Sequence, residues 1–291
     1  MAPKIISIEG NIGSGKSTLV DMLQTHFSEN PRICFLQEPI SVWNTIKDTN
    51  GATILEKYYA DQTKYAFSFQ MMAYISRLSL LRDALKGDYD IIVTERSVYT
   101  DSMVFAKMLY DDKKIEEIEY MIYKKWFDEF LDDLPEIWLI YVKTDPEIAA
   151  YRVAKRAREG ETIPLAYLKN CHKYHEDWLT NHQSSRLLVL DADTDITEFP
   201  LVEASWICEI EKFMLPDQTS HHATHSSVSR DVFRSEQQSI TTSSVIGDER
   251  HREGAQQAHR DMYFPTSISV SSSNSFVKSN ATSAASVAES S

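Results

Sequence analysis

Residues 4–17 read KIISIEGNIGSGKS, and this stretch decides the fold. Its first six residues form an apolar run that is typical of a buried strand, and Gly10 then opens a loop of the form G-x-x-x-x-G-K-[ST]. The apolar spacing over residues 17–27 predicts a helix directly after the loop. Glycines let backbone N–H groups turn inward around a phosphate, and the helix directs its positive end to the same anion. The stretch therefore predicts a strand–loop–helix unit that binds a nucleoside triphosphate.

The residue types in this loop predict separate roles in binding the triphosphate and its metal ion. Lys16 is expected to reach the terminal phosphates, and the Ser17 hydroxyl is expected to ligate Mg²⁺. The expected nucleotide-binding residues of the loop are Gly10, Asn11, Ile12, Gly13, Ser14, Gly15, Lys16, Ser17 and Thr18. The motif does not indicate which group receives the phosphate.

Short apolar runs alternate with helical patterns through the first 215 residues. Strands are expected at 4–9, 32–37, 89–94, 137–143 and 186–191. Helices are expected at 17–27, 60–86, 101–131, 146–158, 165–180 and 201–214, and the pattern at 101–131 is interrupted by an acidic stretch near 110–114. Such alternation predicts an α/β fold in which a five-stranded parallel sheet is covered by helices on both faces.

Charge and cysteine content exclude several classes of protein. The 291 residues carry 43 Asp and Glu against 30 Lys and Arg, and this acidic balance disfavours binding to nucleic acid or to an anionic membrane surface. Cys34, Cys171 and Cys208 show neither close pairing nor metal-ligand spacing, which excludes a disulfide scaffold and favours a reducing compartment. No apolar run reaches the ~18 residues of a membrane span, and the first strand begins too early for a targeting peptide. We therefore expect a cytoplasmic protein.

The composition changes after residue 215. Residues 216–291 are dominated by Ser, Thr, Gln, His and Ala, and they carry too few apolar side chains to offset the entropy of ordering. We therefore expect residues 1–215 to form one domain and 216–291 to be a disordered, Ser-rich tail. The tail is either an inert appendage or a segment that is phosphorylated or binds an unknown partner.

Two polar segments follow neighbouring strands at one edge of the predicted sheet. Glu38 follows the second strand, and Glu95 and Arg96 follow the third. Ligands bind at the carboxyl edge of open α/β sheets. There a carboxylate can take the proton of an attacking hydroxyl, and an arginine can neutralise charge that develops on the transferred group. Each segment alone is equally explained by an ion pair at a strand end, but beside the phosphate loop the two favour phosphoryl transfer.

The sequence resembles the deoxyribonucleoside kinase family over about residues 4–215. The motifs that carry the resemblance are, in chain order, GNIGSGKST (10–18), QEP (37–39) followed by Trp43, the spacing from Tyr59 to Gln70, ERSVYTD (95–101), RVAKRAR (152–158) and IPLAYLKNCHKYHEDWL (163–179). The resemblance implies a P-loop kinase fold, a donor that is ATP or a related triphosphate with Mg²⁺, and phosphate transfer to the 5′-hydroxyl of a deoxyribonucleoside.

The resemblance also implies roles for single residues. Glu38 would be the general base on the 5′-hydroxyl, Arg96 would contact the 5′ oxygen and the phosphate, and Glu95 would hold the water shell of Mg²⁺. Together with Lys16, Glu38 and Arg96 are the expected catalytic residues.

The implied nucleoside site combines aromatic side chains with hydrogen-bonding ones. Besides Glu38 and Arg96 it consists of Trp43, Tyr59, Phe69, Gln70, Ala73, Arg77, Asp101, Phe105 and Glu161. Trp43 and the two Phe residues would flank the base, and Gln70 would read its edge through an amide that both donates and accepts. Tyr59 would hold the 3′-hydroxyl, with Glu161 or Glu159 as its partner. Without the resemblance, the three flanking aromatic residues would be interpreted as core.

A basic stretch at residues 152–164 matches the family's lid. Arg152, Arg156 and Arg158 correspond to its arginines, and closure of such a lid excludes the water that would otherwise take the phosphoryl group. A solvated helix face is the alternative interpretation. The resemblance also assigns Asp193 and Asp195, after the last strand, to a loop that contacts the base of the donor.

The pair Arg77 and Asp101 indicates which nucleoside is preferred. It is similar to the corresponding pair of deoxycytidine, deoxyadenosine and deoxyguanosine kinases, whereas thymidine-preferring relatives tend to have an apolar and a small residue there. A buried Arg–Asp pair offers donors and acceptors to a base edge and occupies the space that a thymine methyl group needs. We therefore expect purine deoxynucleosides or deoxycytidine to be preferred over thymidine; a packing ion pair is the alternative.

Two other functions are compatible with the phosphate loop. A nucleoside monophosphate kinase would need additional basic groups for the acceptor phosphate. A non-enzymatic nucleotide-sensing protein would not need an aromatic site for a second ligand. Because relatives dimerise through equivalent long helices, we also expect a homodimer through 60–86 and 101–131.

Overall fold

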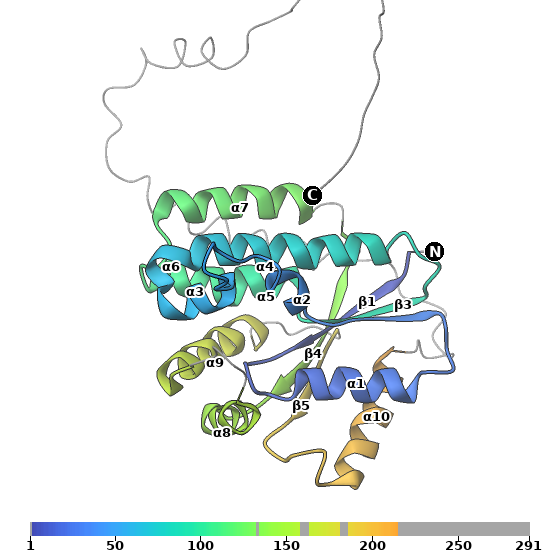
Figure 1. Ribbon diagram of the computed structural model, residues 1–291. Helices are drawn as coiled ribbons and strands as arrows, with labels where there is room; N and C mark the ends of the chain where they lie inside the picture. The colour runs from blue at the N-terminus through green and yellow to red at the C-terminus, as the bar shows by residue number, and fades with distance from the viewer. Residues whose placement is uncertain (1, 132–133, 158–162, 181–185, 215–291) are drawn as a thin grey trace, which may run out of the picture. The chain divides into compact units, whose positions relative to one another are not determined.

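The computed structural model describes residues 2–131, 134–157, 163–180 and 186–214 (Figure 1). The Ser-rich segment 216–291 lies outside the described residues, so its predicted disorder and the domain boundary at 215 stay predictions. Arg158, Glu159 and Glu161 lie outside them as well. In the part of the chain that the structure describes, no helix combines the length and the apolar character that crossing a membrane requires.

The centre of the fold is a five-stranded, all-parallel sheet, as the alternating pattern predicts. Its strands are β1 (Lys4–Glu9), β2 (Ile33–Leu36), β3 (Ile91–Glu95), β4 (Ile137–Lys143) and β5 (Leu187–Asp191). They are arranged in the order β2-β3-β1-β4-β5. Ile8 of β1 is in register with Glu95 of β3. The carboxyl ends of these two central strands therefore lie side by side.

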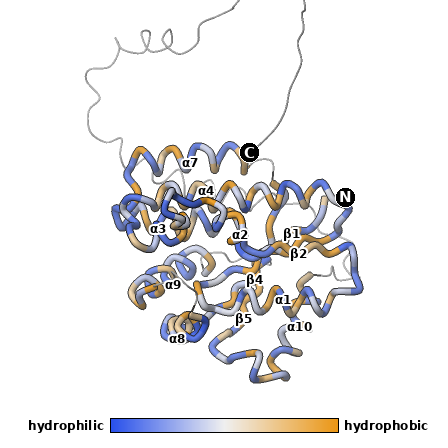
Figure 2. The backbone as a smooth tube through the Cα atoms, in the orientation of Figure 1, coloured by the Kyte–Doolittle hydropathy of each residue, from blue (hydrophilic) through white to orange (hydrophobic). Residues whose placement is uncertain are grey.

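Helices cover both faces of the sheet. They are α1 (Lys16–His26), α2 (Ile40–Trp43), α3 (Ile54–Ala60), α4 (Gln62–Ala84), α5 (Val98–Thr100), the π-helix η1 (Asp101–Ala106), α6 (Lys107–Asp111), α7 (Glu117–Leu131), α8 (Pro146–Arg156), α9 (Leu165–Leu179) and α10 (Pro200–Met214). In Figure 1, α4 and α7 lie on one side of the sheet and α1 and α10 on the other. Because both faces are covered, the strands are apolar along their length, and Figure 2 shows the hydrophobic colour along the central strands.

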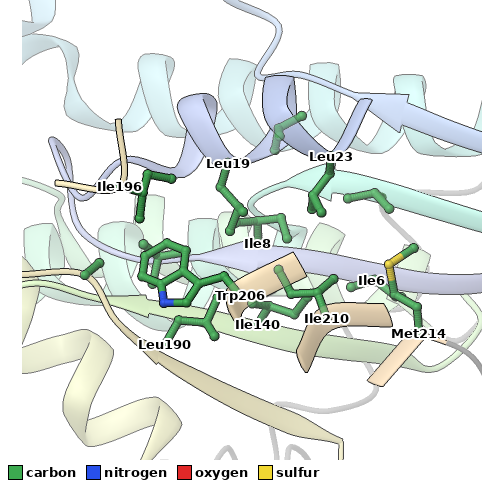
Figure 3. Packing of buried hydrophobic residues seen from close by; sticks show 14 of the residues in the cluster. Ile6, Ile8, Leu19, Leu23, Ile140, Leu190, Ile196, Trp206, Ile210 and Met214 are labelled. Carbon is green, nitrogen blue, oxygen red and sulfur yellow. The ribbon is translucent and has the colours of Figure 1, made fainter. Parts of the chain in front are cut away.

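One hydrophobic cluster holds α1 and α10 against the sheet (Figure 3). Leu19 and Leu23 face the sheet from α1 because residues four apart lie on the same side of a helix. The same spacing brings Trp206, Ile210 and Met214 of α10 to the cluster. This packing fixes α1, and with it the phosphate loop that precedes the helix, relative to β1.

The two long helical patterns differ from the structure mainly near their ends. The helix predicted at 60–86 is α4 (Gln62–Ala84), and the helix α3 before it, which was not predicted, ends at Ala60, so the two helices meet at Asp61. The backbone N–H of Asp61 donates to Lys57 O at the end of α3, and its side chain accepts the N–H of Lys64 at the start of α4. The pattern predicted at 101–131 begins with a π-helix, which was not predicted, and its expected interruption near 110–114 is confirmed, because the left-handed residue Lys113 (φ 59°) lies between α6 and α7.

Candidate active site

A cavity of about 480 Å³ opens at the carboxyl edge of the sheet. Its walls come from the phosphate loop, the segments after β2 and β3, helices α3, α4, η1, α8 and α9, and the loop after β5. The predicted residues that line it are Ile12, Gly13, Ser14, Gly15, Lys16, Ser17, Thr18, Glu38, Trp43, Tyr59, Phe69, Gln70, Ala73, Arg77, Glu95, Arg96, Asp101, Phe105, Arg152, Arg156 and Asp195. Most of the residues singled out from the sequence therefore share one cavity.

The phosphate loop is fitted closely to its surroundings. Gly13 has φ 81°, and a Cβ atom there would lie 2.5 Å from Ala149 O of α8. Lys16 begins α1, and its Nζ donates to Asn11 O over 2.6 Å. Burial, reinforced by the charge of Arg96, lowers the pKa of Lys16 to about 7. The loop thus has a buried amine beside inward-turned backbone, which is an environment that favours an anion.

Three predicted nucleotide-binding residues are not on the cavity wall. Gly10 leads from β1 into the loop. Asn11 is buried, and its Nδ2 donates to Leu168 O of α9 over 2.9 Å, so this side chain ties the loop to α9. Asp193 accepts the backbone N–H of Asp145 over 2.7 Å. The last two side chains thus have structural partners within the protein.

Glu38 accepts hydrogen bonds from two guanidinium groups. Its Oε1 lies 2.7 Å from Arg96 Nη1 and 3.1 Å from Arg77 Nη2. Burial alone would raise the pKa of Glu38, but Arg96, Arg77 and Lys16 outweigh it and lower the pKa to about 2. Glu38 is therefore ionised at neutral pH.

Arg77 extends this cluster into the floor of the cavity. Its Nε donates to Asp101 Oδ2 over 2.9 Å, and its Nη1 donates to the backbone O of Glu95 over 2.7 Å. Arg77 and Asp101 are 4% and 2% exposed, so the predicted pair forms and is buried. This places hydrogen-bonding groups of both signs on the cavity wall.

Ser17 and Glu95 meet beside the phosphate loop. Ser17 Oγ donates to Glu95 Oε1 over 2.8 Å. Both side chains carry an oxygen atom that is able to ligate a metal ion, and oxygen is the ligand type that Mg²⁺ uses together with phosphate oxygens and water. Among the described residues, no group of three or more His, Cys, Asp or Glu side chains could hold a metal by itself.

Aromatic side chains form part of the cavity wall. The rings of Trp43 and Phe69 meet edge to face at 5.4 Å, and Phe105 lies 5.3 Å from the guanidinium carbon of Arg96. Gln70 is 2% exposed, and its Oε1 has no hydrogen-bond partner among the described residues. An unpaired buried acceptor on a cavity wall is available to a ligand donor.

The basic helix α8 is tied to the loop after β5. Arg152 Nη1 and Nη2 donate to the backbone oxygens of Ala192 and Asp193 over 2.8 and 3.2 Å. Arg156 lines the cavity. The predicted lid is described only in part, since residues 158–162 fall outside the described ranges.

Sequence reasoning missed several residues of the site. Tyr58 stacks on Phe69 at 4.5 Å, and its hydroxyl lies 2.9 Å from that of Tyr167, so the two tyrosines bridge α3 and α9 on the cavity wall. The further lining residues are Ile40, Leu55, Ala192, Ile196, Thr197 and Trp206, together with Lys155 and Thr194, which belong to the predicted lid and to the predicted donor-base loop. Glu9 was also missed. It is fully buried behind the cavity, and an acid that ends an apolar strand just before Gly10 is a signal that could have identified it.

The comparisons with known proteins agree with this geometry. A model of the family described as deoxynucleoside kinase matches residues 6–215. The chain is 37% identical over 198 residues to a fowlpox virus protein named as a probable deoxycytidine kinase, covering 66% of this chain and 79% of the relative. It is 33% identical over 240 residues to deoxycytidine kinase 2 of Gallus gallus, covering 72% and 89%. It is 34% identical over 200 residues to a mitochondrial deoxyguanosine kinase of Xenopus laevis, covering 62% and 74%.

The family match spans the parallel sheet, the phosphate loop and the cavity between them. The relatives are named as kinases of deoxynucleosides, which are phosphotransferases. Fold, site and comparisons thus lead to one conclusion: the chain is a P-loop phosphotransferase that belongs to the deoxynucleoside kinase family.

Proposed function

We propose that the protein transfers a phosphoryl group from ATP, or a related triphosphate, to the 5′-hydroxyl of a deoxyribonucleoside. The observation that carries the proposal is the cavity itself, whose wall contains the phosphate loop, Glu38, Arg96 and the aromatic side chains together. A neutral nucleoside in the aromatic part directs its primary alcohol towards the triphosphate held by Lys16. Holding two reactants in line in this way supplies a large part of the rate enhancement in phosphoryl transfer.

Glu38 is the proposed general base. Its low pKa keeps it ionised, so it is able to accept the proton of the 5′-hydroxyl as the oxygen attacks. Arg96, which already contacts Glu38, neutralises charge on the transferred group, and Lys16 does the same on the donor. Because Arg96 is 5% exposed, it needs little reorganisation to do so.

Ser17 and Glu95 are the proposed contacts to Mg²⁺. Their oxygens lie together beside the loop, and the lack of a larger acidic cluster among the described residues suits Mg²⁺, which keeps phosphate and water ligands. When bound, the ion neutralises charge on the donor phosphates. Arg152 and Arg156 of α8 complete the proposed donor site, with Arg158 of the lid and with Asp195 and Asp193 on the donor-base side.

The base is proposed to lie between the aromatic side chains, with its edge towards Gln70 and the Arg77–Asp101 pair. The unpaired Oε1 of Gln70 accepts from an exocyclic amino group, which cytosine and adenine carry and thymine lacks. Deoxycytidine or purine deoxynucleosides are therefore preferred over thymidine. The names of the relatives, deoxycytidine and deoxyguanosine kinases, support this preference.

The acceptor is proposed to be a nucleoside and not a nucleoside monophosphate. A nucleoside monophosphate brings a phosphate of its own to the acceptor site, and this phosphate would need cations near Glu38 that are not already paired. Arg77 and Arg96, which lie there, both donate to that carboxylate. A nucleotide sensor is also disfavoured, because it has no second ligand to occupy the aromatic part of the cavity next to the loop.

The proposed homodimer uses α4 and α7. Both helices carry exposed apolar side chains, namely Ile75 of α4 (41% exposed) and Ile118, Met121, Ile122 and Trp126 of α7 (62%, 60%, 42% and 46%). A second copy of the chain would cover this face.

One assay tests the function as a whole. The four natural deoxynucleosides and dAMP are each incubated with ATP and Mg²⁺, and the formation of the phosphorylated product is measured. We expect the nucleosides, led by deoxycytidine or a purine, to be phosphorylated. Turnover of dAMP in place of deoxyadenosine, or ATP hydrolysis that needs no acceptor, would contradict the proposal.

A further inference from the structure

We propose that Glu9 is a positioning residue, whose buried carboxylate holds the segment after β3 in the conformation that brings Arg96 to Glu38. The inference deepens the proposed function, since it rests on the role given there to Arg96. It assigns a task to a residue at the end of β1 that lines no part of the cavity.

Glu9 has an unusual environment for a carboxylate. Its side chain is fully buried, and no Lys, Arg or His nitrogen among the described residues lies within ion-pair distance of it, although its charge acts to raise the pKa of Lys16. Instead it accepts hydrogen bonds from three hydroxyls. Ser7 Oγ and Ser97 Oγ each lie 2.7 Å from its Oε1, and Thr100 Oγ1 donates to its Oε2. A buried carboxylate without a cation costs free energy, so such a network is expected where it fixes one arrangement of the chain.

Two of the three donors belong to the segment that carries Arg96. Ser97 follows Arg96 directly, and Thr100 ends the short helix α5 that begins after Ser97. The two residues also cap each other, because the Ser97 hydroxyl accepts the N–H of Thr100 over 3.3 Å. The carboxylate of Glu9 therefore holds both ends of the first turn after Arg96.

This turn needs to be held because Arg96 has a strained backbone. Its φ is 61°, in the left-handed region that a residue with a side chain seldom adopts. Its N–H donates to Ile8 O over 3.0 Å, and its carbonyl accepts from Thr94 Oγ1 over 3.0 Å. Such conformations persist only when the surroundings enforce them. Ile8, next to Glu9, thus accepts the backbone N–H of Arg96. Glu9 itself accepts hydrogen bonds from the turn that follows Arg96.

The strained conformation directs the side chain to the site. From it the guanidinium of Arg96 reaches Glu38 over 2.7 Å and lies 5.3 Å from the ring of Phe105. Glu9 is also followed directly by Gly10, so one carboxylate connects the start of the phosphate loop to the segment that faces the acceptor. Relaxation of Arg96 towards negative φ would turn the guanidinium away from Glu38. Misplacement of a catalytic group by about 1 Å is enough to slow turnover up to ~100-fold.

The test is a double-mutant cycle on kcat with Glu9→Gln and Arg96→Ala. Glutamine keeps one oxygen that accepts a hydrogen bond, but its NH₂ group takes the place of the other oxygen. The hydroxyl that donates to that oxygen in the wild type therefore loses its acceptor. We expect Glu9→Gln to lower kcat about 10- to 100-fold in the wild-type background and less than about 2-fold in the Arg96→Ala background. A purely structural role predicts independent effects, so the same fold-loss in both backgrounds would overturn the inference.

Ser7→Ala is the matched control. It removes a hydroxyl that donates to the same oxygen of Glu9 over the same 2.7 Å, but from β1 and not from the Arg96 segment. We expect kcat to stay within about 2-fold of wild type, with thermal unfolding reporting the loss of stability. A Ser7→Ala enzyme as slow as Glu9→Gln would contradict the inference.

A second variant covers the case in which Glu9→Gln does not fold. Thr100→Val keeps the shape of the side chain and removes the hydroxyl that donates to Oε2, and the same cycle is then measured with it. If Arg96→Ala itself leaves kcat unchanged, the proposed role of Arg96 fails and the inference falls with it. If Arg96→Ala slows the enzyme but the cycle is additive, only the inference on Glu9 fails.

Discussion

Arg96 Nη1 lies 2.7 Å from Glu38 Oε1, although the two residues follow different strands of the sheet. The same oxygen accepts from Arg77 Nη2 over 3.1 Å, so one carboxylate atom is shared by two buried guanidinium groups. This arrangement keeps Glu38 ionised but lowers its basicity. The attacking hydroxyl is therefore expected to transfer its proton late, when the bond to phosphorus has begun to form.

Replacement of Glu38 by glutamine tests the base directly. Glu38→Gln keeps the size of the side chain and an oxygen for the two arginines, but it removes the proton acceptor. We expect kcat to fall by ~10²-fold or more, the usual scale for the loss of a general base. Steady-state kinetics at saturating ATP measure the change, and thermal unfolding checks the fold. A kcat within a few-fold of wild type would show that another group takes the proton.

The pKa of Lys16 predicts proton uptake when the donor binds. Because burial lowers this pKa to about 7, about a tenth of the free protein carries the charge at pH 8, whereas the bound triphosphate favours the charged form. We expect binding to take up more protons at pH 8, where Lys16 is mostly neutral in the free protein, than at pH 6, where it is mostly charged. Calorimetric titration in two buffers that differ in ionisation enthalpy measures this uptake.

The control for this titration is Lys16→Arg. Its guanidinium stays charged at both pH values, so any nucleotide binding by this variant should proceed without the uptake at pH 8. Equal uptake by the wild type at pH 6 and pH 8 would be inconsistent with a depressed pKa at this residue.

The Arg77–Asp101 pair predicts a change of base preference. In the double variant Arg77→Leu/Asp101→Ala, an apolar and a small side chain replace the ion pair. The space that a thymine methyl group needs therefore becomes free. We expect the ratio of kcat/KM for thymidine to that for deoxycytidine to rise at least about tenfold. An unchanged ratio would assign the pair to packing alone.

The single variant Arg77→Leu provides the stability control for this exchange. It leaves Asp101 buried without its cation, which costs about 3–5 kcal/mol in comparable buried pairs. We therefore expect the single variant to unfold at lower denaturant concentration than the double variant.

The exposed apolar face of α7 predicts self-association. Trp126→Glu introduces a charge into that face and should shift the protein from dimer to monomer in sedimentation velocity. Leu201→Glu is the matched control, because Leu201 of α10 is 88% exposed but lies outside α4 and α7. Equal sedimentation of the two variants would argue against a dimer through these helices.

Much of the architecture could be predicted because it follows from local patterns. The strand–loop–helix unit around Lys16 has a fixed spacing, and apolar runs between helical patterns leave few alternatives to a parallel sheet. The order of strands then brings Glu38 and Arg96 to one edge. The roles of Trp43 and Gln70 came from resemblance, since an aromatic residue or an amide on a helix carries no signal of the cavity it faces.

The residues that sequence reasoning missed depend on tertiary geometry. The helix α3 was not predicted, because it is short and its boundary with α4 is set by Asp61, whose side chain caps α4, and periodicity alone does not identify a cap. Tyr58 reaches the cavity only because α3 is a separate helix that turns it towards Tyr167. The network of Glu9 joins residues about 90 positions apart, and no pattern along the chain connects them.

The π-helix from Asp101 to Ala106 affects how this protein can acquire new substrates. Both Asp101 and Phe105 line the cavity, and the wider turn between them sets their relative directions. Residues three or four apart lie on the same face of a regular helix, so deletion of one residue inside this turn would keep both side chains on that face but shorten their spacing from four residues to three. A change of length by a single codon would therefore alter the distance and angle between Asp101 and Phe105 without changing either side chain.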